Sequence, residues 1–166
     1  RQGLFSGSRT PSLVIAVAGT SHGAGATHVA MGLAAHLQRQ GLAVIYEEHN
    51  DSGGVRQFAG CTGAEADSYG TLRIAGLPML PAYGKAVQLK PHPYPVVVKD
   101  FGTDQKTFTE EPADGFLLVA TGKPWQWETA GTVIRSPGFL PGTVILYNQF
   151  CKQLSPRLPS PAKETP

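Results

Sequence analysis

A chain of 166 residues has about the length of one domain, and its hydrophobic content of 41% is enough for a buried core. The formal net charge is only +2, with no run of lysines or arginines, which indicates neither nucleic-acid binding nor attraction to an acidic membrane. No apolar run approaches the roughly 20 residues of a membrane helix, so we expect no insertion into a membrane.

The two cysteines, Cys61 and Cys151, are far apart and show no CxxC spacing. This pattern favours free thiols in a reducing compartment, and we therefore expect a cytoplasmic protein. Cys61 has no neighbouring base in the sequence, so it is expected to be a small core residue and not a nucleophile. Because the chain opens on arginine, we interpret it as a fragment of a longer protein.

The first predicted strand spans residues 12–18 (SLVIAVA), an apolar and partly β-branched run typical of a strand buried in a parallel sheet. It leads directly into the loop GTSHGAGATH, residues 19–28. A helix is expected to begin at Thr27 and to be capped by Gly41. Its apolar stripe consists of Val29, Ala30, Leu33, Ala34 and Leu37.

Further short apolar runs predict the remaining strands, at residues 43–46, 96–99, 116–120 and 144–147. Between residues 72 and 95 proline and glycine are frequent, so we expect short extended pieces at 72–74 and 78–80 and no long helix. The pattern predicts an α/β fold of three layers with a mostly parallel central sheet. We divide the chain into an N-terminal extension (1–11), the domain (12–152) and a proline-rich tail or linker (153–166).

The loop at residues 19–28 has the chemistry of a phosphate site without its cation. Gly23 and Gly25 allow close backbone approach, and the helix start at Thr27 turns N–H groups and a partial positive charge toward an anion. Nucleoside-triphosphate loops place a lysine before the Ser/Thr, but that position is Ala26. Weak or unproductive nucleotide binding is therefore expected. A tight turn that serves packing alone is the simpler alternative.

The stretch VIAVAGTSHGAGATHVAMGLAAHLQRQGLAVIYEEHN resembles the N-terminal βαβ unit of the MinD/ParA family of deviant Walker A P-loop ATPases. In that family the loop reads KGGxGKT[TS]. The resemblance puts Ser21 at the signature lysine and Ala26 at the Walker lysine, so both lysines are replaced. Gly23 and Gly25 match loop glycines, and Thr27 matches the magnesium-binding threonine. His22 and His28 stand where the family has glycine and Thr/Ser.

Later segments continue the resemblance in the same order. GVRQF (54–58) is similar to the family's GLRNL, and YPVVVKDFGT is similar to its Walker B segment, in which an aspartate, here Asp100, holds magnesium through water. ADGFLLVAT is similar to the following strand, and VILYNQF to the strand that ends in an adenine-contacting asparagine, here Asn148. Without the family, Asp100 and Asn148 are also ordinary strand-end residues.

The resemblance implies a P-loop NTPase-like fold in a shortened form, with ATP or ADP and Mg²⁺ as cofactors, or with no cofactor at all. The implied metal ligands are Thr27 and Asp100, and no catalytic residue is assigned. The implied nucleotide-binding residues are Gly23, Ala24, Gly25, Ala26, Thr27, His28 and Asn148.

We therefore expect a pseudo-ATPase that acts through a protein partner or as a homodimer. Two alternatives stay open. One is an active ATPase in which His22, His28 or a partner's arginine replaces the lysine. The other is a Rossmann-type dinucleotide site, because Glu47 or Glu48 lies about 20 residues past the glycines, where a ribose-binding carboxylate belongs. Against it, the glycines do not form GxGxxG.

Overall fold

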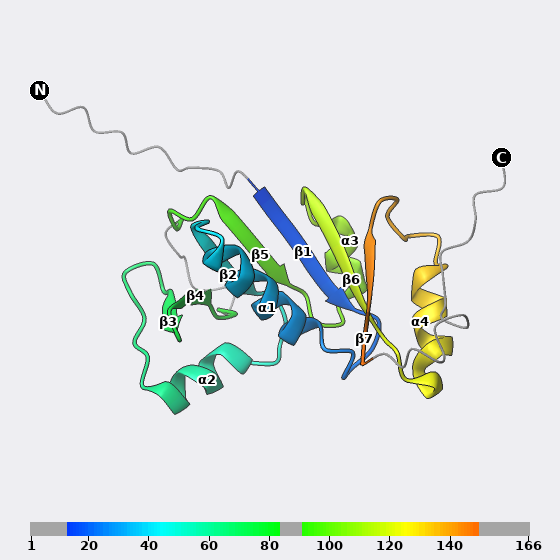
Figure 1. The fold of residues 1–166 in the computed structure, drawn as a ribbon, viewed down its shortest axis with the longest axis horizontal. Helices are drawn as coiled ribbons and strands as arrows, with labels where there is room; N and C mark the ends of the chain where they lie inside the picture. The colour runs from blue at the N-terminus through cyan, green and yellow to red at the C-terminus, as the bar shows by residue number, and fades with distance from the viewer. Residues whose placement is uncertain (1–12, 84–90, 150–166) are drawn as a thin grey trace, which may run out of the picture.

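A computed structural model of the chain describes residues 13–83 and 91–149, and these form a seven-stranded sheet flanked by helices (Figure 1). The elements follow in the order β1 (Leu13–Gly19), α1 (Ala26–Arg39), β2 (Val44–Glu48), α2 (Gly54–Thr62), β3 (Leu72–Ile74), β4 (Leu77–Leu80), β5 (Val96–Asp100), α3 (Gln105–Glu110), β6 (Gly115–Thr121), the 3₁₀ turn η1 (Pro124–Gln126), α4 (Trp127–Ile134) and β7 (Val144–Asn148).

The strands lie in the order β3-β4-β2-β5-β1-β6-β7, and every neighbouring pair is parallel except β3 and β4. The prediction of a mostly parallel α/β sheet is thus confirmed, and each apolar run predicted as a strand is one, within one or two residues. The predicted extension 1–11, the tail 153–166 and the outermost residues of the predicted domain lie outside the described residues.

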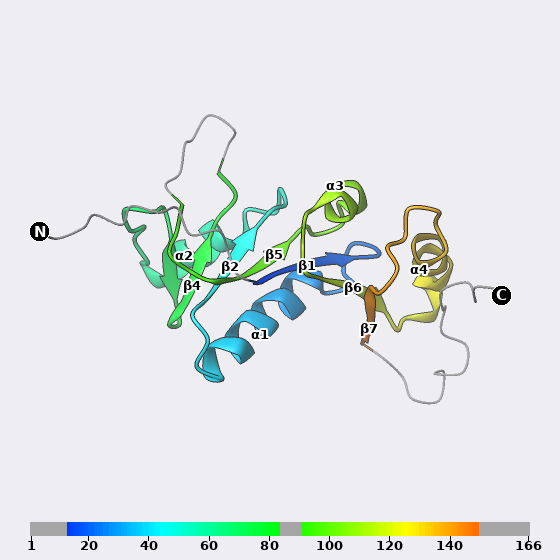
Figure 2. The same cartoon turned by 90° about the horizontal axis from the view of Figure 1, so that it is seen from above.

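Helices cover both faces of the sheet, which gives the three predicted layers. α1 and α3 lie on opposite sides of it (Figure 2). On one face the core joins α1 and α2 to alternate strand residues, including Val17, Tyr46 and Val98. On the other face α3 and α4 pack, through Phe108 and Ile134, against a second cluster. Burial on both sides explains why the central strands read as continuous apolar runs and not as alternating ones.

Helix α1 differs from the prediction in its start and in its buried stripe. It begins at Ala26, one residue before Thr27, because Gly25 takes a left-handed backbone (φ 93°) as the N-cap. Its small residues Ala26, Ala30 and Ala34 are buried, while the larger members of the stripe, Val29, Leu33 and Leu37, are half-buried. Small side chains therefore let the helix approach the sheet closely.

The predicted helix end is confirmed. Gly41 has φ 87° and donates to the Gln38 carbonyl, while Leu42 donates to the Leu37 carbonyl, which is the paired bonding of a glycine-terminated helix. One expectation was wrong: Cys61 is exposed on α2 and is not a core residue, because the buried face of that helix consists of Val55 and Ala59. Within the described ranges no helix is long and apolar enough to cross a membrane.

Candidate functional site

A pocket of about 660 Å³ opens at the carboxyl ends of β1, β2 and β5, beside the start of α1. Parallel sheets place their ligand sites at this edge, where the loops after the strands converge. The pocket is lined by Ser21, His22, Gly23, Gly25, Ala26, Thr27, His49, Asn50, Asp51, Ser52, Phe101, Gly102, Thr103 and Asp104.

The loop after β1 forms one wall of this pocket. Gly23 (φ 77°) and Gly25 (φ 93°) both adopt left-handed backbone, which residues with a Cβ adopt at a cost. The Gly25 carbonyl accepts from the Val29 amide, so the first helical turn follows the loop without a gap. The loop thus presents a helix N-terminus to the pocket, as an anion site requires.

The electrostatics of the pocket differ from those of an ATP site. Its lining residues, all within the described part of the chain, include no lysine or arginine. Two carboxylates, Asp51 and Asp104, line it instead. A hydrogen bond from Thr107 lowers the pKa of Asp104, so this group stays charged near neutral pH. The pocket therefore presents negative side chains to any anion, and the only other ionisable side chains of its lining are His22 and His49.

The predicted nucleotide-binding residues divide into two groups. Gly23, Gly25, Ala26 and Thr27 line the pocket. Ala24 is fully buried, and His28 is exposed on α1; neither lines the pocket, and nor does Asn148. Their roles toward a nucleotide stay predictions.

Three side chains from distant elements hold the loop in place. Asn148, at the end of β7, donates from Nδ2 to the Ala24 carbonyl at 2.9 Å. Gln105 of α3 donates to the Gly19 carbonyl, and Gln126 of η1 donates to the His22 carbonyl at 3.4 Å. The asparagine that the family resemblance assigns to adenine is thus engaged with the loop backbone itself.

Asp100 is completely buried at the end of β5, beneath the pocket. Its Oδ2 accepts a 2.7 Å hydrogen bond from the Tyr46 hydroxyl, and its Oδ1 accepts from the Gly102 amide at 2.9 Å. Burial, together with the negative charge of Asp100 and the hydrogen bond to it, raises the pKa of Tyr46, while a hydrogen bond from Thr27 acts to lower it. The phenol therefore stays protonated and donates a hydrogen bond to Asp100.

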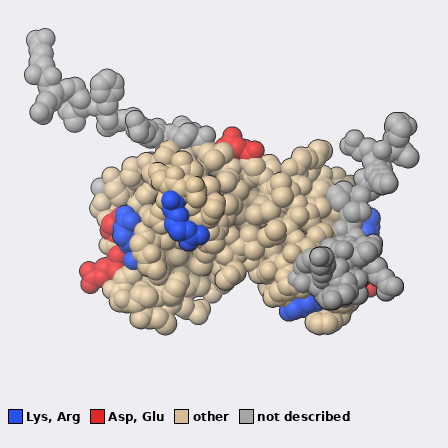
Figure 3. Space-filling model, in the orientation of Figure 1, with Lys and Arg blue, Asp and Glu red and all other residues tan. Residues whose placement is uncertain are grey.

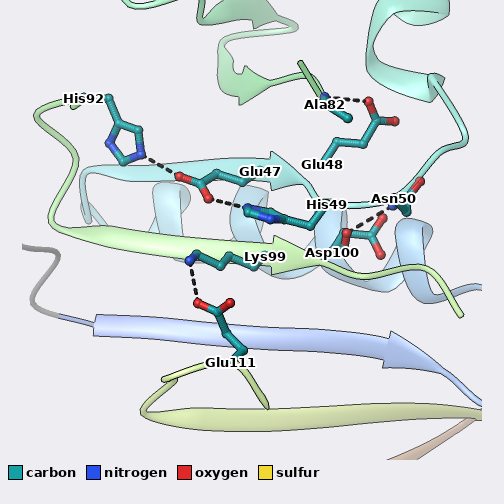
Figure 4. Close-up of polar contacts among 9 residues, drawn as sticks. All are labelled: Glu47, Glu48, His49, Asn50, Ala82, His92, Lys99, Asp100 and Glu111. Carbon is teal, nitrogen blue, oxygen red and sulfur yellow. Dashed lines mark hydrogen bonds and ion pairs between the residues drawn. The ribbon is translucent and has the colours of Figure 1, made fainter. Parts of the chain in front are cut away.

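Glu47 joins two histidines on the opposite face of the sheet. Its Oε2 lies 2.7 Å from Nε2 of His49, and its Oε1 lies 2.7 Å from Nε2 of His92 (Figure 4). Burial acts to raise the pKa of Glu47, but the hydrogen bonds of the two histidines and the charge of Lys99 outweigh it and lower the pKa to about 2. Glu47 thus fixes the His49 ring at the pocket wall and links it to the segment that contains His92.

Two further carboxylates, Glu48 and Glu111, also form contacts within the protein. Glu48 accepts from the Ser52 hydroxyl (3.0 Å) and the Val55 amide (3.3 Å), and from the Ala82 amide at 3.1 Å (Figure 4). Lys99 and Glu111 form an ion pair of 2.6 Å. Neither Glu47 nor Glu48 is thus free to hold a ribose.

The strand order also argues against a dinucleotide-binding domain. In the Rossmann order the first two strands of the sheet are neighbours, whereas here β5 lies between β1 and β2. Together with the engaged glutamates, this removes the physical basis of the Rossmann alternative.

The face shown in Figure 3 carries isolated basic and acidic side chains. In residues 13–83 and 91–149, no group of three or more His, Cys, Asp or Glu side chains is arranged to hold a metal ion. The metal role of Thr27 and Asp100 therefore stays a prediction.

Sequence reasoning did not find the contacts of Tyr46 or the link from Glu47 to His92. Tyr46 lies within an apolar run and reads as an ordinary core residue. His92 lies 45 positions from Glu47 in a proline-rich segment, and no spacing rule connects them. The only local signal is the acidic pair Glu47 and Glu48 at the end of a buried strand, where uncompensated charges would be costly.

No family model and no curated protein sequence matches the chain. Solved structures do. A ParA family ATPase from Chlorobium tepidum TLS matches with a TM-score of 0.59 and 13% identity, over 84% of this chain and 75% of the other. A putative plasmid partition protein from Borrelia burgdorferi B31, bound to AMPPNP, matches with a TM-score of 0.56 and 15% identity, over 86% and 76%. The chain therefore has the ParA/MinD-like P-loop NTPase fold.

Proposed function

We propose that the chain is a ParA-like pseudo-ATPase domain, which binds nucleotide weakly or not at all and acts through contacts with protein. The observation that supports this most directly is the pocket itself. It has the position and the loop geometry of a nucleotide site, yet its lining contains two aspartates and, among the described residues, no lysine or arginine.

The charge of the pocket bears on whether the domain can hydrolyse ATP. A triphosphate carries several negative charges, and phosphoryl transfer depends almost entirely on positioned cations that stabilise them. Loss of one donor to a developing charge typically costs about 10²–10³ in rate. Here Ala26 and Ser21 replace both cationic positions implied by the family resemblance, so turnover is expected to be negligible.

A neighbouring structure of the same fold was solved with AMPPNP, which shows that this fold can hold a nucleotide analogue in that protein. In this chain Asn148, Gln105 and Gln126 donate hydrogen bonds to carbonyls at the start of and within the loop. A loop held by protein contacts does not need a nucleotide to take its shape, which suits a domain that presents one constant surface.

An exposed tryptophan beside the loop supports a role in protein contacts. Trp125 is 78% exposed, and its neighbour Gln126 bonds the His22 carbonyl of the loop. Tryptophan is enriched at the centres of protein interfaces, where it removes a large apolar area from water. We infer that the surface around Trp125 and the loop contacts either a second copy of this chain or another protein.

The decisive experiment is calorimetry with ATP and Mg²⁺, combined with an assay of phosphate release. We expect no heat of binding at micromolar protein and no release above the buffer rate. Micromolar binding together with turnover that disappears in Thr27→Ala and Asp100→Asn would refute the pseudo-ATPase proposal. That result would instead favour an active ATPase in which His22, a pocket residue, supplies the cation.

A further inference from the structure

Tyr46 lies between the two residues at which a P-loop NTPase fold holds magnesium. Its hydroxyl donates to Oδ2 of Asp100 at 2.7 Å, and Thr27 lies near enough to the phenol oxygen to act on its pKa. Thr27 lies in the first turn of α1, Tyr46 lies in the middle of β2, and Asp100 ends β5. One neutral hydroxyl therefore lies where three elements meet at the floor of the pocket.

Both carboxylate oxygens of Asp100 accept a hydrogen bond from the protein. Oδ2 accepts from the Tyr46 hydroxyl, and Oδ1 accepts from the Gly102 amide at 2.9 Å. The residue has no exposed surface, and it is absent from the pocket lining. Each oxygen keeps a second lone pair, but a hydrated cation in the pocket does not reach a carboxylate that is closed off from solvent.

The floor of the pocket does not provide the coordination geometry that Mg²⁺ requires. The ion requires near-octahedral oxygen ligands at about 2.0–2.1 Å and retains several of its waters, so it needs open volume beside the carboxylate. The Tyr46 side chain is completely buried in the α1 core cluster, so the phenol cannot swing aside without opening that core. The residues present therefore do not fit the metal that the fold implies.

We propose that the Tyr46 hydroxyl takes the place of the magnesium ion beside Asp100, so that the chain binds no divalent cation at this position. The inference deepens the proposed function and rests on it for the identity of the pocket. The hydrogen bond from Tyr46 to Asp100 itself joins β2 to β5 at the floor of the site.

The test is a titration of the purified chain with Mn²⁺ alone, followed by electron paramagnetic resonance, in which the signal of the free ion falls when the ion binds. The wild-type chain is expected to leave the signal unchanged up to millimolar Mn²⁺. A loss of signal that Asp100→Asn abolishes would overturn the proposal. A loss of signal that persists in Asp100→Asn but disappears in Asp104→Asn would place the ion at the rim of the pocket. That result would support the proposal, because no ion would then be bound at Asp100.

Tyr46→Phe is the informative variant, because it removes only the hydroxyl and keeps the ring in the core. It removes the hydroxyl that occupies Oδ2 of Asp100, so Mn²⁺ affinity should rise at least tenfold over wild type. Equal affinities in the two proteins would show that the hydroxyl is not what excludes the ion and would overturn the proposal. The wild-type titration remains decisive even where the variant does not fold.

Phosphate release measured on the same wild-type samples separates this inference from the proposed function. If Mn²⁺ binds at Asp100 and no phosphate is released, the proposal that Tyr46 takes the place of the metal is wrong, but the pseudo-ATPase proposal is unaffected. If phosphate is released from ATP and no Mn²⁺ binds at Asp100, the pseudo-ATPase proposal is wrong, but the proposal on Tyr46 is unaffected.

Discussion

Asn148 and Gly25 are in such close contact that a side chain added to the glycine would displace the Asn148 amide. A Cβ on Gly25 would overlap the Asn148 amide nitrogen, which itself donates to the Ala24 carbonyl at 2.9 Å. The end of β7 thus contacts the loop that follows β1. The shape of the pocket therefore depends on residues more than a hundred positions apart in the sequence.

Gly25→Ala is expected to destabilise the chain by about 2–4 kcal/mol. A left-handed backbone costs a residue with a Cβ about 1–2 kcal/mol, and the overlap with Asn148 adds a similar amount. Urea denaturation followed by circular dichroism measures the difference. Gly23→Ala is the matched control, because Gly23 also has a left-handed backbone but has open space around its Cβ position.

The control separates backbone strain from the contact. Gly23→Ala should cost only about 1–2 kcal/mol. Combining Gly25→Ala with Asn148→Ala should recover part of the loss, since the overlapping amide is gone. Equal costs for the two glycine variants would contradict a specific contact between Gly25 and Asn148.

The sequence was sufficient to predict most of the fold, but less of the site. Runs such as residues 12–18 are apolar because both faces of a central strand are covered, so the strands and a mostly parallel sheet could be predicted from local pattern, whereas the strand order could not. The pocket depends on contacts that no local pattern encodes. Tyr46 reads as a core residue, and only the register of β2 against β5 brings its hydroxyl to Asp100.

The exposure of Cys61 illustrates the same limit. Its helix, α2 (GVRQFAGCT), mixes apolar, small and polar residues, and the way the helix packs decides which of them face the sheet. The sequence likewise could not distinguish whether Asn148 faces a ligand or the loop, because both assignments suit an asparagine at a strand end.

Glu47 should make the stability of the chain depend on pH in the acid range. Its pKa is lowered from 4.5 to about 2 in the folded chain, so its contribution is fully present above pH 4.5 and is lost as the pH falls toward 2. The difference corresponds to at most about 3 kcal/mol. Denaturation midpoints between pH 6 and pH 2 measure it.

Glu47→Gln should already be less stable than wild type at pH 6, because the charged acceptor of His49 and His92 is lost. Its stability should then change less between pH 4.5 and pH 2. Glu65→Gln, at an exposed carboxylate, serves as control and should follow the wild-type curve. Parallel curves for Glu47→Gln and wild type would contradict the assignment.

Restoring the missing cations should restore affinity for ATP. Ser21→Lys, alone or with Ala26→Lys, places a lysine at the wall of the pocket. Because Ala26 is buried against the sheet, the thermal stability of each variant is measured beside its affinity. A charge-assisted contact to phosphate is worth about 1.5–3 kcal/mol, so binding should tighten by about tenfold or more. Fluorescence titration with a labelled ATP in EDTA avoids any dependence on metal.

The control for this gain carries the same charge elsewhere. His36→Lys adds a lysine at an exposed position near the end of α1, far from the loop. It should leave the affinity unchanged. A gain of equal size in His36→Lys would mean that net charge, and not the loop, attracts the nucleotide, and it would count against a nucleotide-shaped pocket.

Association of the chain with protein should be independent of nucleotide and sensitive to Trp125. If a second copy is the partner, sedimentation velocity should give the same dimer fraction with and without ATP and Mg²⁺, because the loop is fixed by protein contacts. Trp125→Ser should weaken the dimer by about tenfold or more, because removing an interface tryptophan commonly costs about 2 kcal/mol of binding free energy. Phe58→Ser, at a 43% exposed aromatic residue on α2, is the control and should leave the dimer intact. A dimer that appears only with nucleotide would instead indicate a working switch, since the fold would then be using the ligand to build its interface.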